Sequence, residues 1–172
     1  MKKHNGMRPH DIAILLKIAS KGQEPWLMKD LAQELFISPS EVSESLHRSV
    51  RAKLLGSDKK HLNKLALLEF LKFGLSYVFP LRSGPISRGI KTAISAPPLD
   101  RDILSDDQFV WTYGEGTSQG QSLEPLHPKT PEACLQDSKY YELMALTDTL
   151  RIGRAREKSL AYNYLKQSIE SA

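Results

Sequence analysis

Cysteine is almost absent from this sequence, since Cys134 is the only one among 172 residues. A single cysteine excludes an intramolecular disulfide framework and a cysteine-based zinc site, and it is typical of a reducing compartment. The nearest charged neighbours, Glu132 and Asp137, are acidic and no cation is adjacent, so we expect an inert, packed thiol.

Long apolar runs are also missing. Residues 12–16 form an apolar run that is too short for a signal peptide, and residues 65–80 are interrupted by Glu69 and Lys72 and fall short of a membrane span. Hydrophobic residues make up 40% of the chain and charged residues 26%, as in an ordinary soluble protein. The sequence therefore predicts a cytoplasmic protein with no membrane contact.

Recognisable catalytic motifs are missing as well. There is no Walker, dinucleotide-binding or nucleophile-elbow motif, and the five histidines are scattered. The acids at positions 100, 102, 106 and 107 lack the Gly and Glu of a calcium loop and indicate a solvated or helix-capping run. The glycines at 114, 116 and 120 precede no Lys-Ser or Lys-Thr pair, which favours a hairpin turn over a phosphate loop. We therefore expect no enzymatic activity, no cofactor and no metal.

The charge is distributed unevenly. Residues 1–96 hold 16 Lys and Arg against 8 Asp and Glu, for a net charge of +8, whereas residues 97–172 hold 8 against 12, for −4. The pair Pro97-Pro98 favours extended chain between these halves. We predict two domains, 1–96 and 97–172, of which the first faces nucleic acid.

The strongest local signal in the basic half is a helix start at Ser38. Ser38 is a suitable N-cap, and Pro39 fits the first helical position because its missing N–H costs nothing there. Glu41 stands where it can complete a capping box, and Ile37 and Val42 stand where a hydrophobic staple is expected.

The helix that starts there has two faces. Its apolar stripe consists of Val42, Leu46, Val50 and Leu54. A shorter helix over residues 28–36 precedes it, with Leu31, Ala32 and Leu35 pointing inward. Two helices joined by a tight turn, the second polar outside and basic toward its end, are typical of a helix-turn-helix. The polar face carries Ser40, Ser43, Glu44, His47, Arg48 and Arg51.

This stretch resembles the winged helix-turn-helix of MarR-like bacterial transcriptional regulators. The resemblance is carried by Leu31-Ala32, Leu35, Ile37-Ser38 and Val42-Ser43, and extends loosely over residues 8–94. Phe36 stands where such motifs usually have Gly, so we expect a different turn geometry with Phe36 buried. Glu44 replaces a common Arg and would read cytosine N4.

The rest of the basic half provides a first helix, a further helix and a candidate wing. Residues 8–20 and 61–73 have helical periodicity, and Gly56 is a plausible C-cap for the helix that starts at Pro39. Residues 76–81 and 89–94 are expected to be the strands of a hairpin that carries Arg82, Arg88 and Lys91. These three cations could contact DNA or could simply be solvated, and the sequence favours neither alternative.

The acidic half predicts a strand over 108–113 that pairs with 121–126, and helices from Thr130 as cap, over 138–150 and over 157–169. The middle one of these three helices is apolar nearly all round and is expected to be central to the core. The basic run 151–156 could stabilise a helix end, bind an anionic ligand or nucleic acid, or pair with the acids at 100–107; we favour an internal ionic or partner-docking role. The last helix either completes the core or packs onto a second subunit.

Together these features predict an α+β, mainly helical protein, with an N-terminal winged-helix-like domain and a small mixed α/β C-terminal domain. The expected function is sequence-specific binding of double-stranded DNA by a homodimeric transcriptional regulator. Ser40, Ser43, Glu44 and His47 would face base edges, and the arginines of the helix and the hairpin basics would hold phosphates. The alternative is a protein-interaction module or antitoxin-like partner that uses the helix-turn-helix as a docking or autoregulatory surface.

Overall fold

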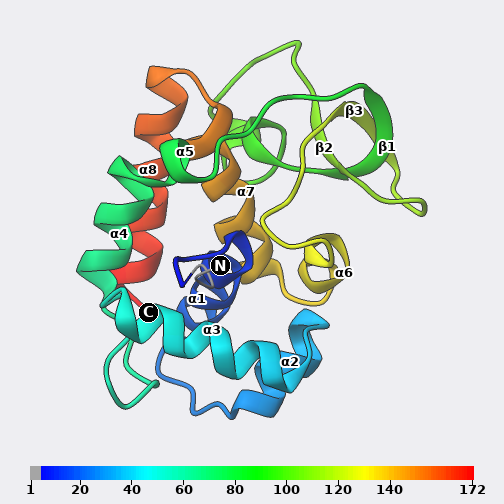
Figure 1. The fold of residues 1–172 in the computed structure, drawn as a ribbon. Coiled ribbons are helices and arrows are strands. Elements are labelled where there is room, and N and C mark those ends of the chain that lie inside the picture. Colours follow the sequence, from blue (N-terminus) through cyan, green and yellow to red (C-terminus); the bar gives the residue numbers. More distant parts are fainter. Residues whose placement is uncertain (1–4) are drawn as a thin grey trace.

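The computed structural model describes residues 5–172 and shows a mainly helical α+β protein, as predicted. A central pair of helices, α1 and α7, is surrounded by α2 and α3 at one end, α4 and α8 on one side, and a small sheet at the other end (Figure 1).

Helix α1 (Pro9–Lys21) is the middle of the N-terminal helical group, which also contains α2 (Met28–Leu35) and α3 (Pro39–Arg51). The predicted stripe of α1 is buried, but so is every other side chain from Asp11 to Ala19. The reason is that α1 is packed against α2 and α3 as well as α7, so no face is left for solvent.

The start of α3 matches the prediction in most respects. Ser38 is the N-cap, its Oγ accepts a hydrogen bond from the Glu41 backbone N at 3.3 Å, and Pro39 is the first helical residue. The capping box is not completed, because the Glu41 carboxylate turns to Arg48 and His10 instead.

The turn between α2 and α3 differs from the expectation for Phe36. This residue ends α2 in the left-handed conformation, with φ 56° and ψ 41°, and its side chain is 47% exposed rather than buried. The backbone N–H groups of Phe36 and Ile37 both donate to the carbonyl of Ala32, the second at 3.0 Å. These bonds offset the strain of a bulky left-handed residue.

A short loop follows α3, and its place and pairing were not predicted. The helix is capped at Ala52 rather than Gly56. Leu55 and Leu62 form an isolated antiparallel bridge, reinforced by bonds from Gly56 N to His61 O (2.8 Å) and from Asn63 N to Leu54 O (3.0 Å). We call residues 54–63 the stub wing, because they form a minimal hairpin directly after α3.

The hairpin expected over residues 76–94 does not exist. Helix α4 (Lys64–Phe73) is followed by the short α5 (Leu75–Val78), so the first expected strand is partly helical. Only the first half of the second expected strand lies in β1 (Ile86–Lys91), which pairs with strands from the acidic half of the chain, and Ala93 and Ile94 belong to a 3-10 turn.

The sheet contains β1, β2 (Phe109–Thr112) and β3 (Ser118–Ser122). Strand β1 pairs antiparallel with both others, and β2 and β3 run parallel to each other, which closes a small barrel. The predicted strand at 108–113 is confirmed, but the antiparallel hairpin with 121–126 is wrong. Glycine allows this closure: a Cβ at Gly89 would lie 1.8 Å from the Trp111 carbonyl oxygen, and one at Gly116 would lie 2.3 Å from the Gly89 oxygen.

The C-terminal helices are α6 (Thr130–Leu135), α7 (Ser138–Ile152) and α8 (Ala155–Glu170), after two short 3-10 turns at Ala93–Ser95 and Leu99–Arg101. Lys129, not Thr130, caps α6. The central position of α7 is confirmed, since it is packed against α1, α6 and α8. Helix α8 buries Ala161, Leu165 and Ile169 against α7 and α4, so it completes the core of this chain.

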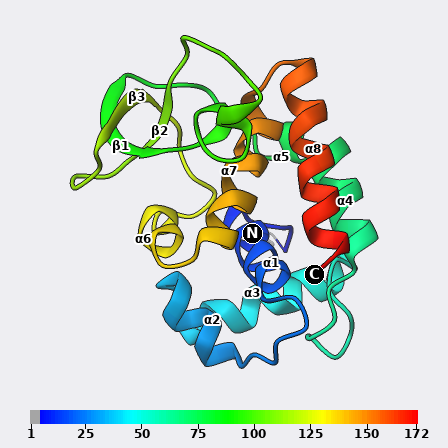
Figure 2. The same ribbon diagram turned by 180° about the vertical axis from the view of Figure 1, so that it is seen from behind.

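One apolar core spans both halves of the chain. At its centre α1 and α7, one from each half, lie side by side (Figure 2). Lys17 Nζ lies 2.6 Å from Asp137 Oδ2, and the Tyr140 hydroxyl donates to the Ala13 carbonyl at 3.2 Å. The boundary expected after residue 96 therefore passes between strands of one sheet and through one core. Within residues 5–172, no helix has both the length and the apolarity needed to cross a membrane.

Candidate nucleic-acid interface

The outer face of α3 presents most of the polar residues expected there. Ser40, Glu44, His47 and Arg51 are exposed and Ser43 is half-buried. They share this face because Val42 and Leu46 turn the opposite face into the core, at 0% and 4% exposure.

His47 connects this face to the stub wing. Its Nδ1 lies 2.7 Å from the Ser43 carbonyl oxygen, which can only accept, so Nδ1 carries the proton. In the neutral ring Nε2 is then an acceptor, and the Lys59 ammonium donates to it at 2.9 Å. The cation of the stub wing is thereby held beside the outer face of α3.

Arg48 is not on this face, contrary to the expectation. Its side chain is 10% exposed and binds the fully buried Asp11 with two nitrogens, Nε to Oδ2 at 2.9 Å and Nη2 to Oδ1 at 2.8 Å. Nη2 also donates to Glu41 Oε1 at 2.7 Å. Arg48 therefore clamps α3 to α1, and in this arrangement it is not free to hold a phosphate.

The same ion pairs shift the titration of their members. The hydrogen bonds from Arg48 to Asp11 raise the pKa of the guanidinium. Burial raises the pKa of Glu41, but the hydrogen bonds from Arg48 and His10 outweigh it, and the pKa falls below its usual value. Both shifts favour the charged forms that hold the two helices together.

The three cations of the expected hairpin lie elsewhere. Arg82, Arg88 and Lys91 are exposed, but they belong to the loop before β1 and to β1 itself. The sheet and α3 lie at opposite ends of the molecule in both views (Figures 1 and 2), so these residues do not form one surface with α3.

The end of α3 and the stub wing provide cations that were not predicted from the sequence. Lys53 is exposed at the end of α3 with φ 62°, and Lys59 reaches His47. The Lys60 side chain binds Trp26. Its Nζ lies 2.7 Å from the Trp26 carbonyl oxygen and 4.0 Å from the centre of the indole ring. The sequence feature that could have predicted this basic loop is the pair Lys59-Lys60, directly after the turn residues Gly56-Ser57-Asp58.

Asp58 stabilises the turn of the stub wing. Its Oδ1 accepts hydrogen bonds from the backbone N of Lys60 at 2.9 Å and of His61 at 3.1 Å. These two bonds, together with a hydrogen bond to the His61 side chain, lower the pKa of Asp58 to about 2. The carboxylate therefore stays charged and holds the backbone of the turn at Lys60 and His61.

Other candidate sites from the sequence have structural roles. Cys134 is buried, and burial raises the pKa of its thiol, as an inert thiol requires. Arg151 pairs internally with Asp148 at 3.1 Å, whereas Arg154 lies 3.7 Å from Asp107 on the surface. Among residues 5–172, no group of three His, Cys, Asp or Glu side chains is placed to hold a metal.

Comparisons of the chain with protein-family models, with curated proteins and with solved structures give no match. The fold and the site define it as an α+β, mainly helical protein in which a capped, solvent-facing helix lies beside a short basic loop.

Proposed function

We propose that this protein binds double-stranded DNA in a sequence-specific way, as a transcriptional regulator, through the outer face of α3 and the stub wing. The observation that carries the proposal is the contact between Lys59 and His47, which joins a basic loop to a polar helix face. In helix-turn-helix proteins the second helix enters the major groove, and nearby cations hold the backbone. This is a binding role rather than a catalytic one.

The proposed DNA-binding residues fall into two groups, those that would contact base edges and those that would contact phosphates. Ser40, Ser43, Glu44 and His47 occupy the exposed first three turns of α3, where base edges would be read. Arg51, Lys53 and Lys59 follow at its C-terminal end and on the stub wing, where phosphates would lie. Arg48 supports them indirectly, because its bonds to Asp11 fix the position of α3 on α1.

The first test is salt-dependent binding of labelled duplex DNA, selected from a random pool and measured by fluorescence anisotropy. Contact with several phosphates should lower affinity by orders of magnitude between about 50 and 200 mM salt. Arg51→Ala should weaken binding to all sequences and reduce the salt slope by roughly one unit. His47→Ala should instead reduce the preference for the selected site over a scrambled one.

Arg88→Ala is the matched control, since Arg88 is also an exposed arginine and lies on β1, at the far end of the molecule. It should leave affinity and salt slope unchanged. Equal losses from Arg51→Ala and Arg88→Ala would mean non-specific attraction to a basic protein, and the proposal would fail.

A homodimer is part of the proposal, because two copies would read two half-sites. Sedimentation of the protein with and without the selected duplex tests it.

A protein-docking role for the same end of the molecule is the second candidate. It is favoured by apolar side chains exposed at both ends of α2: Leu27 at 55%, Met28 at 38% and Phe36 at 47%. If Phe36→Ser abolishes capture of a copurifying protein while duplex binding stays absent in every variant, the docking role replaces the DNA-binding one.

A further inference from the structure

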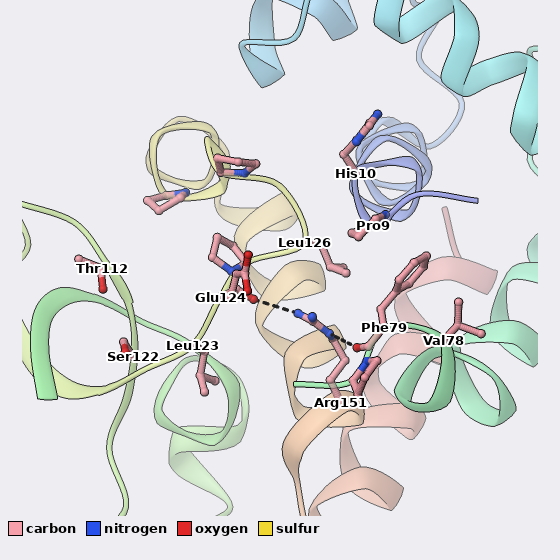
Figure 3. Close-up of a pocket in the computed structure, with 14 residues that line it drawn as sticks. Pro9, His10, Val78, Phe79, Thr112, Ser122, Leu123, Glu124, Leu126 and Arg151 are labelled. Carbon is pink, nitrogen blue, oxygen red and sulfur yellow. Dashed lines mark hydrogen bonds between the residues drawn. The ribbon is translucent and has the colours of Figure 1, made fainter. Parts of the chain in front are cut away.

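A cavity of about 740 Å³ lies between the sheet and the helices (Figure 3). It is bounded by the start of α1, the end of α5, the segment 122–128, and residues of α6 and α7. This volume lies within the usual range for small-molecule sites, which often form where two parts of a fold meet.

The wall is unusually rich in proline. A proline has a fixed φ and no backbone N–H, so this wall is rigid and offers no hydrogen-bond donor at those positions. The side chains of Phe79, Leu123 and Leu126 add apolar surface. The five prolines are Pro9, Pro80, Pro125, Pro128 and Pro131.

Arg151 provides a fixed donor at the floor of the cavity. Its side chain is 6% exposed, with Nε donating to the Phe79 carbonyl at 3.0 Å and Nη1 to the Glu124 carbonyl at 3.1 Å, as the dashed lines in Figure 3 mark. Within residues 5–172, the side-chain hydrogen bonds of Arg151 are made by Nε and Nη1, and none by Nη2. The guanidinium is thus held by the protein and keeps one nitrogen for a ligand.

The charge around this donor disfavours an anion. Asp148, 1% exposed, already neutralises Arg151 through Nη1, and it is fixed by bonds from Trp111 Nε1 (2.7 Å) and Thr92 Oγ1 (2.9 Å). Glu124 adds an exposed carboxyl group at the lining, and His10 directs Nε2 to Glu41 at 2.8 Å. An anionic ligand would be repelled by the Asp148 carboxylate, and no unpaired cation would offset that repulsion. A neutral ligand with a hydrogen-bond acceptor needs only the free N–H of Arg151.

We propose that this cavity binds a small, uncharged, mainly apolar molecule whose carbonyl oxygen accepts a hydrogen bond from Arg151 Nη2. The apolar body of the ligand lies against Phe79, Leu126 and the proline wall. The site does not depend on the proposed DNA binding, so each stands or fails separately.

The probe is prodan, a neutral naphthalene ketone whose emission shifts to the blue in apolar surroundings. Titration with the full chain should show saturable, one-to-one binding with a blue shift. Val78→Trp, which places an indole at the lining of the cavity, should weaken binding about tenfold or more. Val78 is 53% exposed, so the fold has room for the larger side chain.

Tyr77→Trp is the matched control, because Tyr77 is the neighbouring residue of α5, is 84% exposed and does not line the cavity. It should bind prodan as the unmodified protein does. Thermal melts establish that both variants are folded. No saturable binding, or equal binding by both folded variants, would overturn the site.

Three competitors of one ring size test the chemistry of the ligand. Acetylnaphthalene should displace prodan about tenfold better than ethylnaphthalene, which lacks the carbonyl, because a hydrogen bond from a charged donor is worth about that factor or more. It should also displace prodan better than naphthoate at neutral pH. Equal displacement by ethylnaphthalene would remove the role of Arg151, and stronger displacement by naphthoate would overturn the preference for a neutral ligand.

Discussion

Arg48 and Asp11 form the contact on which the position of α3 depends. Asp11 is fully buried on α1, and two nitrogens of Arg48 bind its two carboxylate oxygens. A bidentate pair of this kind fixes both distance and orientation between helices. Asp11 depends on this pair more than Arg48 does, because Asp11 is fully buried and would lose its cation, whereas Arg48 also binds Glu41.

Arg48→Met should therefore lower the free energy of unfolding by about 3–5 kcal/mol, since it leaves Asp11 buried without its cation. Arg51→Met is the matched control on the exposed face of the same helix and should change stability by no more than about 0.5 kcal/mol. Urea denaturation of the two variants measures the difference. Similar small losses would show that Asp11 is solvated or protonated instead.

Ser45 and Ser49, unlike Arg48 and Asp11, are buried polar residues without a partner among residues 5–172. Both are 0% exposed on the inner face of α3, and neither hydroxyl has a hydrogen-bond partner in the part of the chain that the structure describes. A buried polar group without a partner costs free energy that alanine does not.

Ser45→Ala should accordingly raise the free energy of unfolding by about 1 kcal/mol. Ser38→Ala should lower it by about 1 kcal/mol, because the N-cap bond to Glu41 N is lost. Chemical denaturation measures both changes, and the dependence of the unfolding free energy on denaturant concentration should be the same in the two variants. A loss of stability in Ser45→Ala would indicate a hydrogen bond absent from this structure.

At the scale of elements, the sheet depends on close backbone approaches rather than on large side chains. Strand β1 lies against both β2 and β3, and glycines stand at the points where the backbones come nearest. The sheet in turn holds Trp111, which is fully buried and donates to Asp148 on α7. Closure of the strands and attachment of the sheet to the helices are therefore linked.

Gly89→Ala should disrupt this closure, because its Cβ would lie 1.8 Å from the Trp111 carbonyl oxygen. We expect a lower melting temperature and red-shifted tryptophan emission as Trp111 becomes hydrated. Gly114→Ala is the control, since a Cβ there meets no atom within 4 Å. Equal melting temperatures for the two variants would contradict the observed strand pairing.

At the scale of the whole molecule, α1 and α7 unite the basic and acidic halves of the chain. Residues from Ile12 to Ile169 belong to one apolar cluster, and Lys17 reaches across it to Asp137. The proposed DNA-binding end and the cavity therefore share one apolar core, and we expect them to unfold together.

Unfolding in urea should accordingly be a single transition. Trp26 reports on the N-terminal helical group and Trp111 on the sheet. In Trp26→Phe and in Trp111→Phe, the fluorescence of the remaining tryptophan should change at the same urea concentration as far-UV circular dichroism. A fluorescence change that precedes the loss of helix in either variant would mean that the two parts unfold independently.

The sequence by itself determined the features that depend on residues close together in the chain. Ser38 and Pro39 start α3 because a cap bonds to an N–H three residues away. The positions of α1, α7 and α8, though not their exact ends, follow from the apolar residues of each segment. The strand at Phe109–Thr112 was evident for the same reason, through its β-rich composition. The mainly helical α+β class followed from these elements.

Only the tertiary structure decided which polar residues stay exposed and which strands pair. Arg48 and His47 are neighbours in α3, yet the Arg48 side chain turns inward and is only 10% exposed, because it binds Asp11, 37 residues away. The stub wing was not predicted, because its bridge between Leu55 and Leu62 lies in a loop whose sequence has little β propensity. The hairpin expected at 76–94 is absent because β1 pairs instead with strands from the other half of the chain. The cavity at Arg151 likewise combines α1, α5, α6 and α7 with residues 122–128. Such contacts join segments distant in sequence, so no local pattern of residues encodes them.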